Sequence, residues 1–305
     1  MRLFETANYT IIPHRKIAYF ISGALIVISL IAIFGRGLQY GIDFRGGIEI
    51  ILEFEEPVSV EEMRTELMDP LGTMPDIRRF GDGRDMLIRT DTERSTSELQ
   101  EIVLTTAASL YPDNPSSIIQ TELVGPSFAD DLRNAALMSI IFAMIVIFLY
   151  VLIRFKKWSY SAGAVAALIH DVIITLGIFT ILHGLVPFSL DINQSLIAAF
   201  LTIVGYSLND TVVVFDRIRE NSLIFKTESF DKMVNRSVNN TLSRTVITSL
   251  TTLFVVTILF TFGGDVLKGL SFALIVGVIL GTYSSIFVAS SLLVDLQLKT
   301  RKNVA

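Results

Sequence analysis

The chain lacks cysteine altogether and has only three histidines among its 305 residues. Without cysteine there is no disulfide framework, no thiol catalysis and no cysteine metal site. His14, His170 and His183 leave little for a zinc site. A GxxxxGK(S/T) phosphate loop is also missing, so no nucleotide site is expected. We therefore expect no thiol chemistry, no metal site and no bound nucleotide.

Long apolar runs are what the sequence has in abundance. Hydrophobic residues make up 51% of the chain, and the mean hydropathy is +0.58. A soluble protein of this length would not carry so many uninterrupted runs, which indicates a polytopic α-helical membrane protein. Six runs are long enough to be transmembrane helices, at residues 17–34, 135–153, 160–182, 192–214, 246–262 and 269–293.

The first run follows a basic flank, His14-Arg15-Lys16, as a signal peptide would. The run is long for that role, and the Gly35-Arg36-Gly37 that follows it offers no small-residue cleavage site. A retained membrane anchor is the favoured interpretation.

The charges are segregated along the chain. Residues 36–134 hold 20 acidic residues against nine arginines and no lysine, whereas the rest holds 16 basic and 10 acidic residues. Basic residues gather in the linkers after the second and fourth runs and in the tail. By the positive-inside rule, residues 1–16 and 294–305 are cytoplasmic and residues 35–134 lie outside, in the periplasm.

Residues 35–134 predict a separate α+β domain. Alternating apolar patterns indicate strands at 48–54, 76–80, 85–90 and 117–124, with a turn at Gly81–Arg84 between the second and third. Capping boxes at Ser59/Glu62 and Ser95/Glu98 open helices that end near residues 71 and 110. The order βαββαβ is typical of a ferredoxin-like fold. Its acids fall mostly where a solvated surface needs them, and no catalytic constellation stands out.

The fourth run contains an aspartate, Asp210, preceded by Asn209. An ionised carboxylate is costly inside a bilayer and is by default a functional hypothesis. Tyr206 and Ser207 share its helix face. Arg244, where the fifth run begins, is the best candidate counter-charge, and a carboxyl that alternately meets water and a cation could load and release a proton. A permanently hydrogen-bonded structural carboxylate, and an arginine that only sets topology, are the alternatives.

A second polar pair, His170-Asp171, lies near the middle of the third run. Adjacent helical residues point about 100° apart, so the two cannot serve one face equally. A proton relay is possible, and hydrogen bonding to other helices is slightly favoured. Gly277 and Gly281 form a small-xxx-small pair in the last run, which we interpret as packing within the chain.

Four stretches carry a resemblance to a known family. They are GIDFRGG (residues 41–47), VGP (124–126), GYSLNDTVVVFDRIREN (205–221) and SRT (243–245). With six runs and one inserted domain, the chain resembles the SecF family, the smaller membrane subunits of SecDF protein-export complexes in the resistance-nodulation-division superfamily. The motif positions with an expected structural role are Gly41, Asp43, Phe44, Gly46, Gly47, Gly125, Pro126, Gly205, Asp216 and Arg217.

The resemblance implies proton-driven assistance to protein translocation across the bacterial inner membrane. Asp210 would then carry the proton and Arg244 would be its charged partner, with Asn209, Tyr206 and Ser207 beside them. The implied partners are SecD, the SecYEG translocon, the translocating preprotein and the lipid bilayer, with no nucleic acid. The resemblance also implies a protein that is not an enzyme, with no catalytic residues and no cofactor. The six spans would be half of a pseudo-symmetric twelve-helix unit.

Three other interpretations compete with this one. A proton-driven exporter of lipids or drugs usually has larger outer domains and both halves on one chain. An intramembrane protease is disfavoured because Ser207 lies in an unbroken helix and is followed by Leu208 instead of a glycine. A structural subunit that only stabilises its partner predicts that neutralising Asp210 has no effect.

Overall fold

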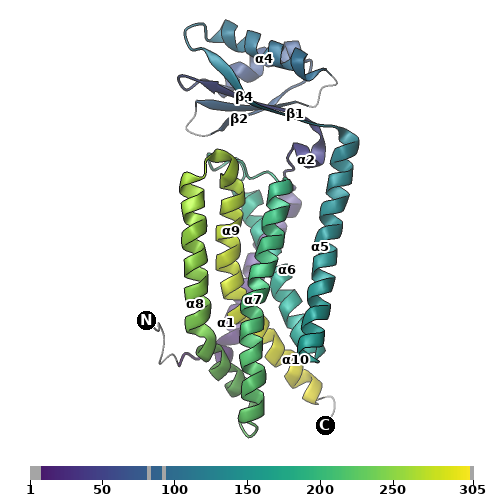
Figure 1. The fold of residues 1–305 in the computed structure, drawn as a ribbon, viewed down its shortest axis with the longest axis vertical. Helices are drawn as coiled ribbons and strands as arrows, with labels where there is room; N and C mark the ends of the chain where they lie inside the picture. The colour runs from purple at the N-terminus through teal and green to yellow at the C-terminus, as the bar shows by residue number, and fades with distance from the viewer. Residues whose placement is uncertain (1–7, 81–83, 91–93, 303–305) are drawn as a thin grey trace. The chain divides into compact units, whose positions relative to one another are not determined.

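The computed structural model describes residues 8–80, 84–90 and 94–302. Most of the turn expected at Gly81–Arg84 lies outside these ranges. The chain divides into two compact units (Figure 1). We call residues 39–137 and 182–194 the sheet unit, and the rest of the chain the helical unit.

The sheet unit contains a four-stranded antiparallel sheet in the order β2-β3-β1-β4. This order and the alternation of strands and helices confirm the predicted βαββαβ fold. In chain order the elements are α2 (Ile42–Arg45), β1 (Gly47–Phe54), α3 (Val60–Leu71), β2 (Asp76–Phe80), β3 (Asp85–Thr90), α4 (Thr96–Leu110) and β4 (Ser116–Val124).

The core of the sheet unit follows from alternation along β1. Its apolar side chains at every second position join one buried cluster with residues of α3 and α4. Both helices begin as the capping boxes predict, because the Ser59 and Ser95 hydroxyls accept hydrogen bonds from the amides of Glu62 and Glu98, at 3.4 and 3.3 Å. The core residues contributed by β1, α3 and α4 are Ile48, Ile50, Leu52, Phe54, Met63, Leu67, Leu71, Leu99, Val103 and Ala107.

The helical unit is built from long helices. Six helical segments of the described chain are long and apolar enough to cross a membrane. They comprise α1 (Arg15–Arg36, preceded by the short η1, Ile12–His14), α5 (Pro126–Phe155), α6 (Trp158–Leu182), α7 (Gln194–Ile224), α8 (Phe230–Phe262), and a last segment that runs through α9 (Asp265–Tyr283), a π-helical stretch η2 (Ser284–Ala289) and α10 (Ser290–Lys302).

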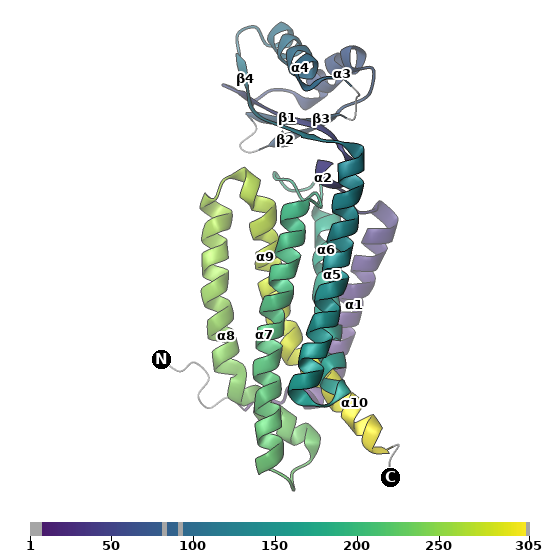
Figure 2. The ribbon, with the colours of Figure 1, turned by 45° about the vertical axis from the view of Figure 1, so that its right-hand side comes forward.

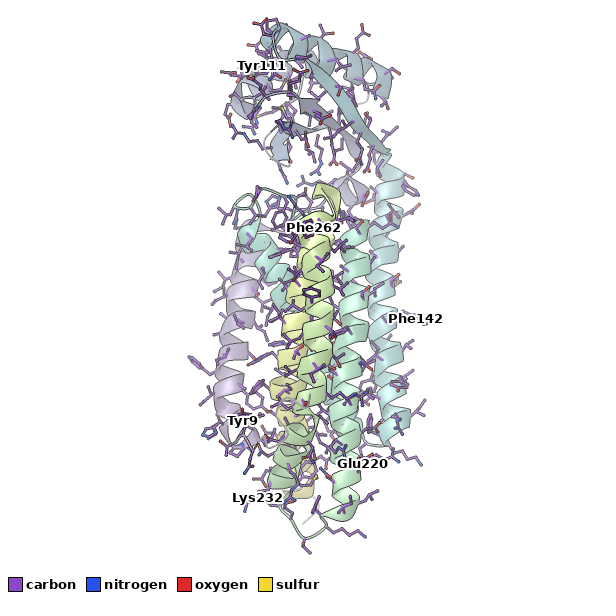
Figure 3. The ribbon with its side chains drawn as sticks, turned by 60° about the vertical axis from the view of Figure 1, so that its left-hand side comes forward. Tyr9, Tyr111, Phe142, Glu220, Lys232 and Phe262 are labelled. Carbon is purple, nitrogen blue, oxygen red and sulfur yellow. The ribbon has the colours of Figure 1, made fainter. Side chains whose placement is uncertain are left out.

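Two of these helices continue well beyond the apolar runs. α7 ends at Ile224 and α8 begins at Phe230, so the basic stretch between the fourth and fifth runs is mostly a helical hairpin instead of an extended linker. Within the helical unit, Glu220 and Lys232 lie at one end of the bundle and Phe262 lies at the other (Figure 3).

The helices differ in how much surface they bury. α6, α7 and the last segment are the most buried, and Figure 2 shows α7 and α9 between α8 and α1 in that view. α1, α5 and α8 instead present large apolar side chains outward, such as Phe20, Phe142 and Phe254, which are 77%, 69% and 68% exposed. Such faces suit contact with lipid.

Candidate functional site

Asp210 is buried in α7, with 3% of its surface exposed. Its carboxylate Oδ2 accepts a hydrogen bond from the Ser249 hydroxyl of α8, at 3.4 Å. Ser249 accepts one in turn from the Thr282 hydroxyl of α9, at 2.6 Å. Because a hydroxyl both donates and accepts, this chain of groups from three helices can hand a proton to or from the carboxylate. The sequence analysis missed Ser249 and Thr282, since neither serine nor threonine is unusual in a membrane helix.

Arg244 lies on α8 within electrostatic range of Asp210. Among the described residues no ion pair joins the two side chains, and Arg244 is exposed. The helix explains the difference from Ser249, because residues five apart point about 140° away from each other. Ser249 can therefore face Asp210 while Arg244 faces away from the interior of the chain.

The three predicted neighbours of Asp210 on α7 have different surroundings. Ser207 is buried, but its hydroxyl donates to Asp171 of α6, at 2.8 Å, instead of to Asp210. The Tyr206 hydroxyl is buried and has no hydrogen-bond partner among the described residues. Asn209 is exposed. The shared face that we expected for Tyr206, Ser207 and Asp210 is thus divided between two neighbouring helices.

Asp171 forms a second buried cluster with hydroxyls from two other helical segments. One carboxylate oxygen accepts hydrogen bonds from Ser207 of α7 and Ser284 of η2, at 2.8 and 2.7 Å. The other is 2.9 Å from Nδ1 of His170. The expectation of bonding to other helices holds for Asp171, yet both members of the pair are buried and they bond each other.

His170 has one ring nitrogen left over. Its Nε2 is buried without a hydrogen-bond partner in the part of the chain described. The ring stacks on Tyr283, with the two centroids 6.0 Å apart, and the Tyr283 hydroxyl is 3.1 Å from the Ser22 hydroxyl of α1. The cluster thus joins α1, α6, α7 and the last segment.

Comparison with known proteins gives the chain a family. Residues 105–299 match the family described as "Protein export membrane protein SecD/SecF, C-terminal", and residues 31–58 match the "SecD/SecF GG Motif". The protein translocase subunit SecF of Rhodothermus marinus is 55% identical over 97% of this chain and 96% of its own length. The SecF subunit of Desulfurispirillum indicum is 44% identical over 92% and 89%.

The chain belongs to the SecF family of protein translocase subunits. It also resembles the crystal structure of SecDF from Thermus thermophilus, described as a translocon-associated membrane protein, with a TM-score of 0.86 and 34% identity. That match covers 98% of this chain and 40% of the SecDF chain. With its six apolar helices, this SecF-family chain is a multi-pass inner-membrane protein.

Two of the SecF-family motifs meet in the sheet unit. Gly46 has a φ of +78°, and a Cβ there would lie 3.1 Å from Cα of Pro126 and 3.3 Å from the carbonyl oxygen of Val124. Only glycine suits both the backbone and the space. Asp43 accepts a hydrogen bond from the backbone N–H of Gln194, at 2.7 Å, and Phe44 is buried.

The SecF-family motif at the far end of α7 joins two helices. Asp216 accepts hydrogen bonds from the Arg154 guanidinium at the end of α5, at 2.8 and 2.9 Å. Arg217 pairs with Glu220 one turn along α7, at 3.0 Å. Asp216 is therefore an interhelical contact, whereas Arg217 makes only an exposed local pair.

Proposed function

We propose that this SecF-family chain assists protein translocation by coupling proton flow at Asp210 to the cycle of a SecDF-type complex. The observation that carries the proposal is the buried carboxylate of Asp210 in the middle of α7. It is hydrogen-bonded to Ser249 of α8, which is hydrogen-bonded in turn to Thr282 of α9. A purely structural carboxylate would be expected to have several short, strong donors, as Asp171 has. Asp210 has one hydroxyl at 3.4 Å and a nearby exposed arginine, which leaves it free to exchange a proton.

The exposed face of α7 supports SecD as the partner that completes the path. Ala198, Thr202, Gly205 and Asn209 are exposed and recur every three or four residues along one side of the helix. The large apolar side chains that α1, α5 and α8 present outward are missing from this stretch. Small and polar residues suit close packing of another membrane helix better than contact with lipid. SecD is the partner that the SecDF resemblance supplies.

The same proposal includes the orientation and the remaining partners. Both termini are cytoplasmic and residues 35–134 are periplasmic, as the basic linkers predict. The SecYEG translocon and the emerging preprotein would be engaged from the outer side. Moving one charge through the membrane potential supplies about 2.3 kcal/mol per 100 mV, which is enough to bias a two-state movement. A shift from 1:99 to 99:1 needs roughly 5.5 kcal/mol, so a pH gradient or further protons must add to it.

The test is Asp210→Asn in membrane vesicles at unchanged levels of both subunits. Asparagine keeps the shape of the side chain and loses its titration. We expect the part of protein export that depends on the proton gradient to disappear, while Asp113→Asn, which neutralises an exposed acid of the sheet unit, leaves it intact. If Asp210→Asn exports like the parent chain, the structural-subunit interpretation replaces this one.

A further inference from the structure

Within the sheet unit, the linker between α6 and α7 is bonded to strands β2 and β3 through a buried carboxylate. Asp191 lies in this linker, and its side chain is 3% exposed. It accepts hydrogen bonds from Arg78 of β2, at 3.0 and 3.1 Å, and from Arg89 of β3, at 3.2 Å. The Ser189 hydroxyl adds another, at 2.8 Å. The sequence analysis gave this residue no role.

The face of the sheet that receives Asp191 is itself charged. Arg89 stands directly opposite Glu49 of β1 and Asp76 of β2 in the strand register. It bonds Glu49 at 2.6 Å, and Arg78 bonds Asp76 at 2.6 Å. Most acids of this domain were expected at a solvated surface, and Glu49 is an exception, because its side chain is only 14% exposed.

His183 completes the cluster at the other end of the linker. Its Nε2 lies 2.9 Å from Nη1 of Arg78 and 3.1 Å from Oδ1 of Asp191. Nε2 must accept in the first contact and donate in the second, so one of the two bonds is made at a time. In this cluster two arginines, Arg78 and Arg89, face three carboxylates, which belong to Asp191, Asp76 and Glu49.

The cluster shifts the pKa values of its two buried acids, Asp191 and Glu49, in opposite directions. Burial alone would raise the pKa of Asp191, but the hydrogen bond from His183 and the charges of Arg89 and Arg78 outweigh it, and the pKa lies well below its usual range. Burial raises the pKa of Glu49, with Arg89 opposing the shift. The linker carboxylate therefore stays ionised and bonded at any pH a membrane protein ordinarily meets.

Backbone contacts continue from Asp191 into the first turn of α7. Ile192 donates to the carbonyl of Gln39 at 2.8 Å and accepts from the amide of Gly41 at 2.9 Å, as a parallel bridge between Tyr40 and Ile192. Gln194, two residues after Ile192, is the first residue of α7, and its backbone N–H donates a hydrogen bond to Asp43. Asp43 thus takes up one of the free amides that begin a helix.

We propose that Asp191 and Asp43 are positioning residues, which fix the beginning of α7 to the sheet unit so that movement of the helix that carries Asp210 is passed to this domain. The tie is permanent and does not open during the cycle. The positional part of the inference stands on the contacts alone, whereas its consequence for export rests on the proposed function of Asp210. The two parts are therefore tested separately.

The positional part is tested by thiol labelling in membranes that contain the assembled complex. The chain has no cysteine, so Ile192→Cys, at a position 6% exposed, gives it a single buried thiol. A membrane-permeant maleimide should label it slowly in the parent chain and in Asp113→Asn. Adding Asp191→Asn should speed labelling by about 100-fold, because it deprives the buried Arg89 and the half-buried Arg78 of a shared carboxylate. Equal rates in the two variants would overturn the inference.

The consequence for export is tested with a disulfide between residues 40 and 192, which pair in the parallel bridge. Directly paired backbones lie about 4.8 Å apart, which a disulfide can span. Tyr40→Cys with Ile192→Cys should leave gradient-driven export unchanged when oxidised. Asp191→Asn should lower export, the oxidised pair should restore it, and reduction of the disulfide should remove the rescue. If oxidation stops export in the parent chain, the tie must open and the inference is wrong. Failure of the Asp210→Asn test would remove the proposed function and leave the labelling result standing.

Discussion

Two glycines on facing helices should respond in opposite ways to the same added methyl group. A Cβ at Gly277 of α9 would lie within 3.0 Å of three side-chain carbons of Ile203 on α7, which is 2% exposed. A Cβ at Gly205 of α7 would meet nothing within 4 Å. We expect Gly277→Ala to destabilise the chain itself, and Gly205→Ala to weaken only its association with SecD.

The magnitudes follow from the contacts. Extra carbon in a packed core costs typically 1–3 kcal/mol, and Gly277→Ala should cost about 2 because three atoms of one side chain must move. Gly205→Ala should be neutral or stabilise the isolated chain by up to about 1 kcal/mol, since alanine is the better helix former. Ile203→Ala removes all three obstructing carbons and should cost about 2–5 kcal/mol. The double variant of Gly277→Ala and Ile203→Ala should cost less than the sum of the two single variants, because the new methyl occupies part of the space.

The assay has two readouts on the full chain. Unfolding of the purified protein in an SDS titration gives the stability of each variant, and co-purification with SecD gives the strength of assembly. If Gly277→Ala is as stable as the parent chain, or if Gly205→Ala lowers stability without SecD, the packing we describe between α7 and α9 is wrong. Additivity of Gly277→Ala and Ile203→Ala would also refute the contact, because residues that touch should show a coupling energy.

Two further outcomes can be measured on the same protein. Asp171→Leu removes the acceptor for the Ser207 and Ser284 hydroxyls. At about 0.6–1.7 kcal/mol per hydrogen bond in a membrane, it should lower the stability in the SDS titration by roughly 1–3 kcal/mol. Asp171→Asn should cost clearly less, because its amide can donate hydrogen bonds to the two hydroxyls. The pKa of Asp191 in the linker is lowered in the folded state, so its contribution to stability is present above the unfolded pKa of about 4 and is lost as the pH falls below that value. The pKa of Glu49 is raised, so this group takes up its proton at a higher pH, and that step does not lower the stability. Hydrogen exchange of the linker amides, corrected for intrinsic rates, should rise as the pH falls below about 4, and this rise should be lost in Asp191→Asn.

The parts of this structure that could be predicted depend on residues close together in the sequence. Ser59 and Ser95 each bond an amide three residues away, so their helices could be placed almost to the residue. Hydropathy located the six spans for the same reason. It could not find where α7 ends and α8 begins, because these parts of the two helices bury apolar residues such as Ile218 and Val234 against the protein instead of against lipid.

The partners of each buried carboxylate were not predictable. Asp171 is bonded by Ser284, which lies 113 residues away, and Asp210 by Ser249, 39 residues away. Periodicity gives the direction of a side chain around its own helix but not which helix it meets. The 60° between residues three apart is enough to send Ser207 to α6 and Asp210 to α8. Asp191 was hidden for a related reason, since a lone acid in a polar linker has no pattern that marks it as buried.

The energies decide whether the tie at Asp191 can act as a switch. A proton that crosses 100 mV delivers about 2.3 kcal/mol. Depriving a buried ion pair of one partner costs about 3–5 kcal/mol, and the Asp191 carboxylate bonds two arginines at once. One proton at that potential is therefore too weak to open the tie but sufficient to bias a movement that leaves the tie closed. If Asp210 carries the proton as proposed, a displacement of α7 driven by one proton would therefore leave the bonds of Gln194, Ile192 and Asp191 closed.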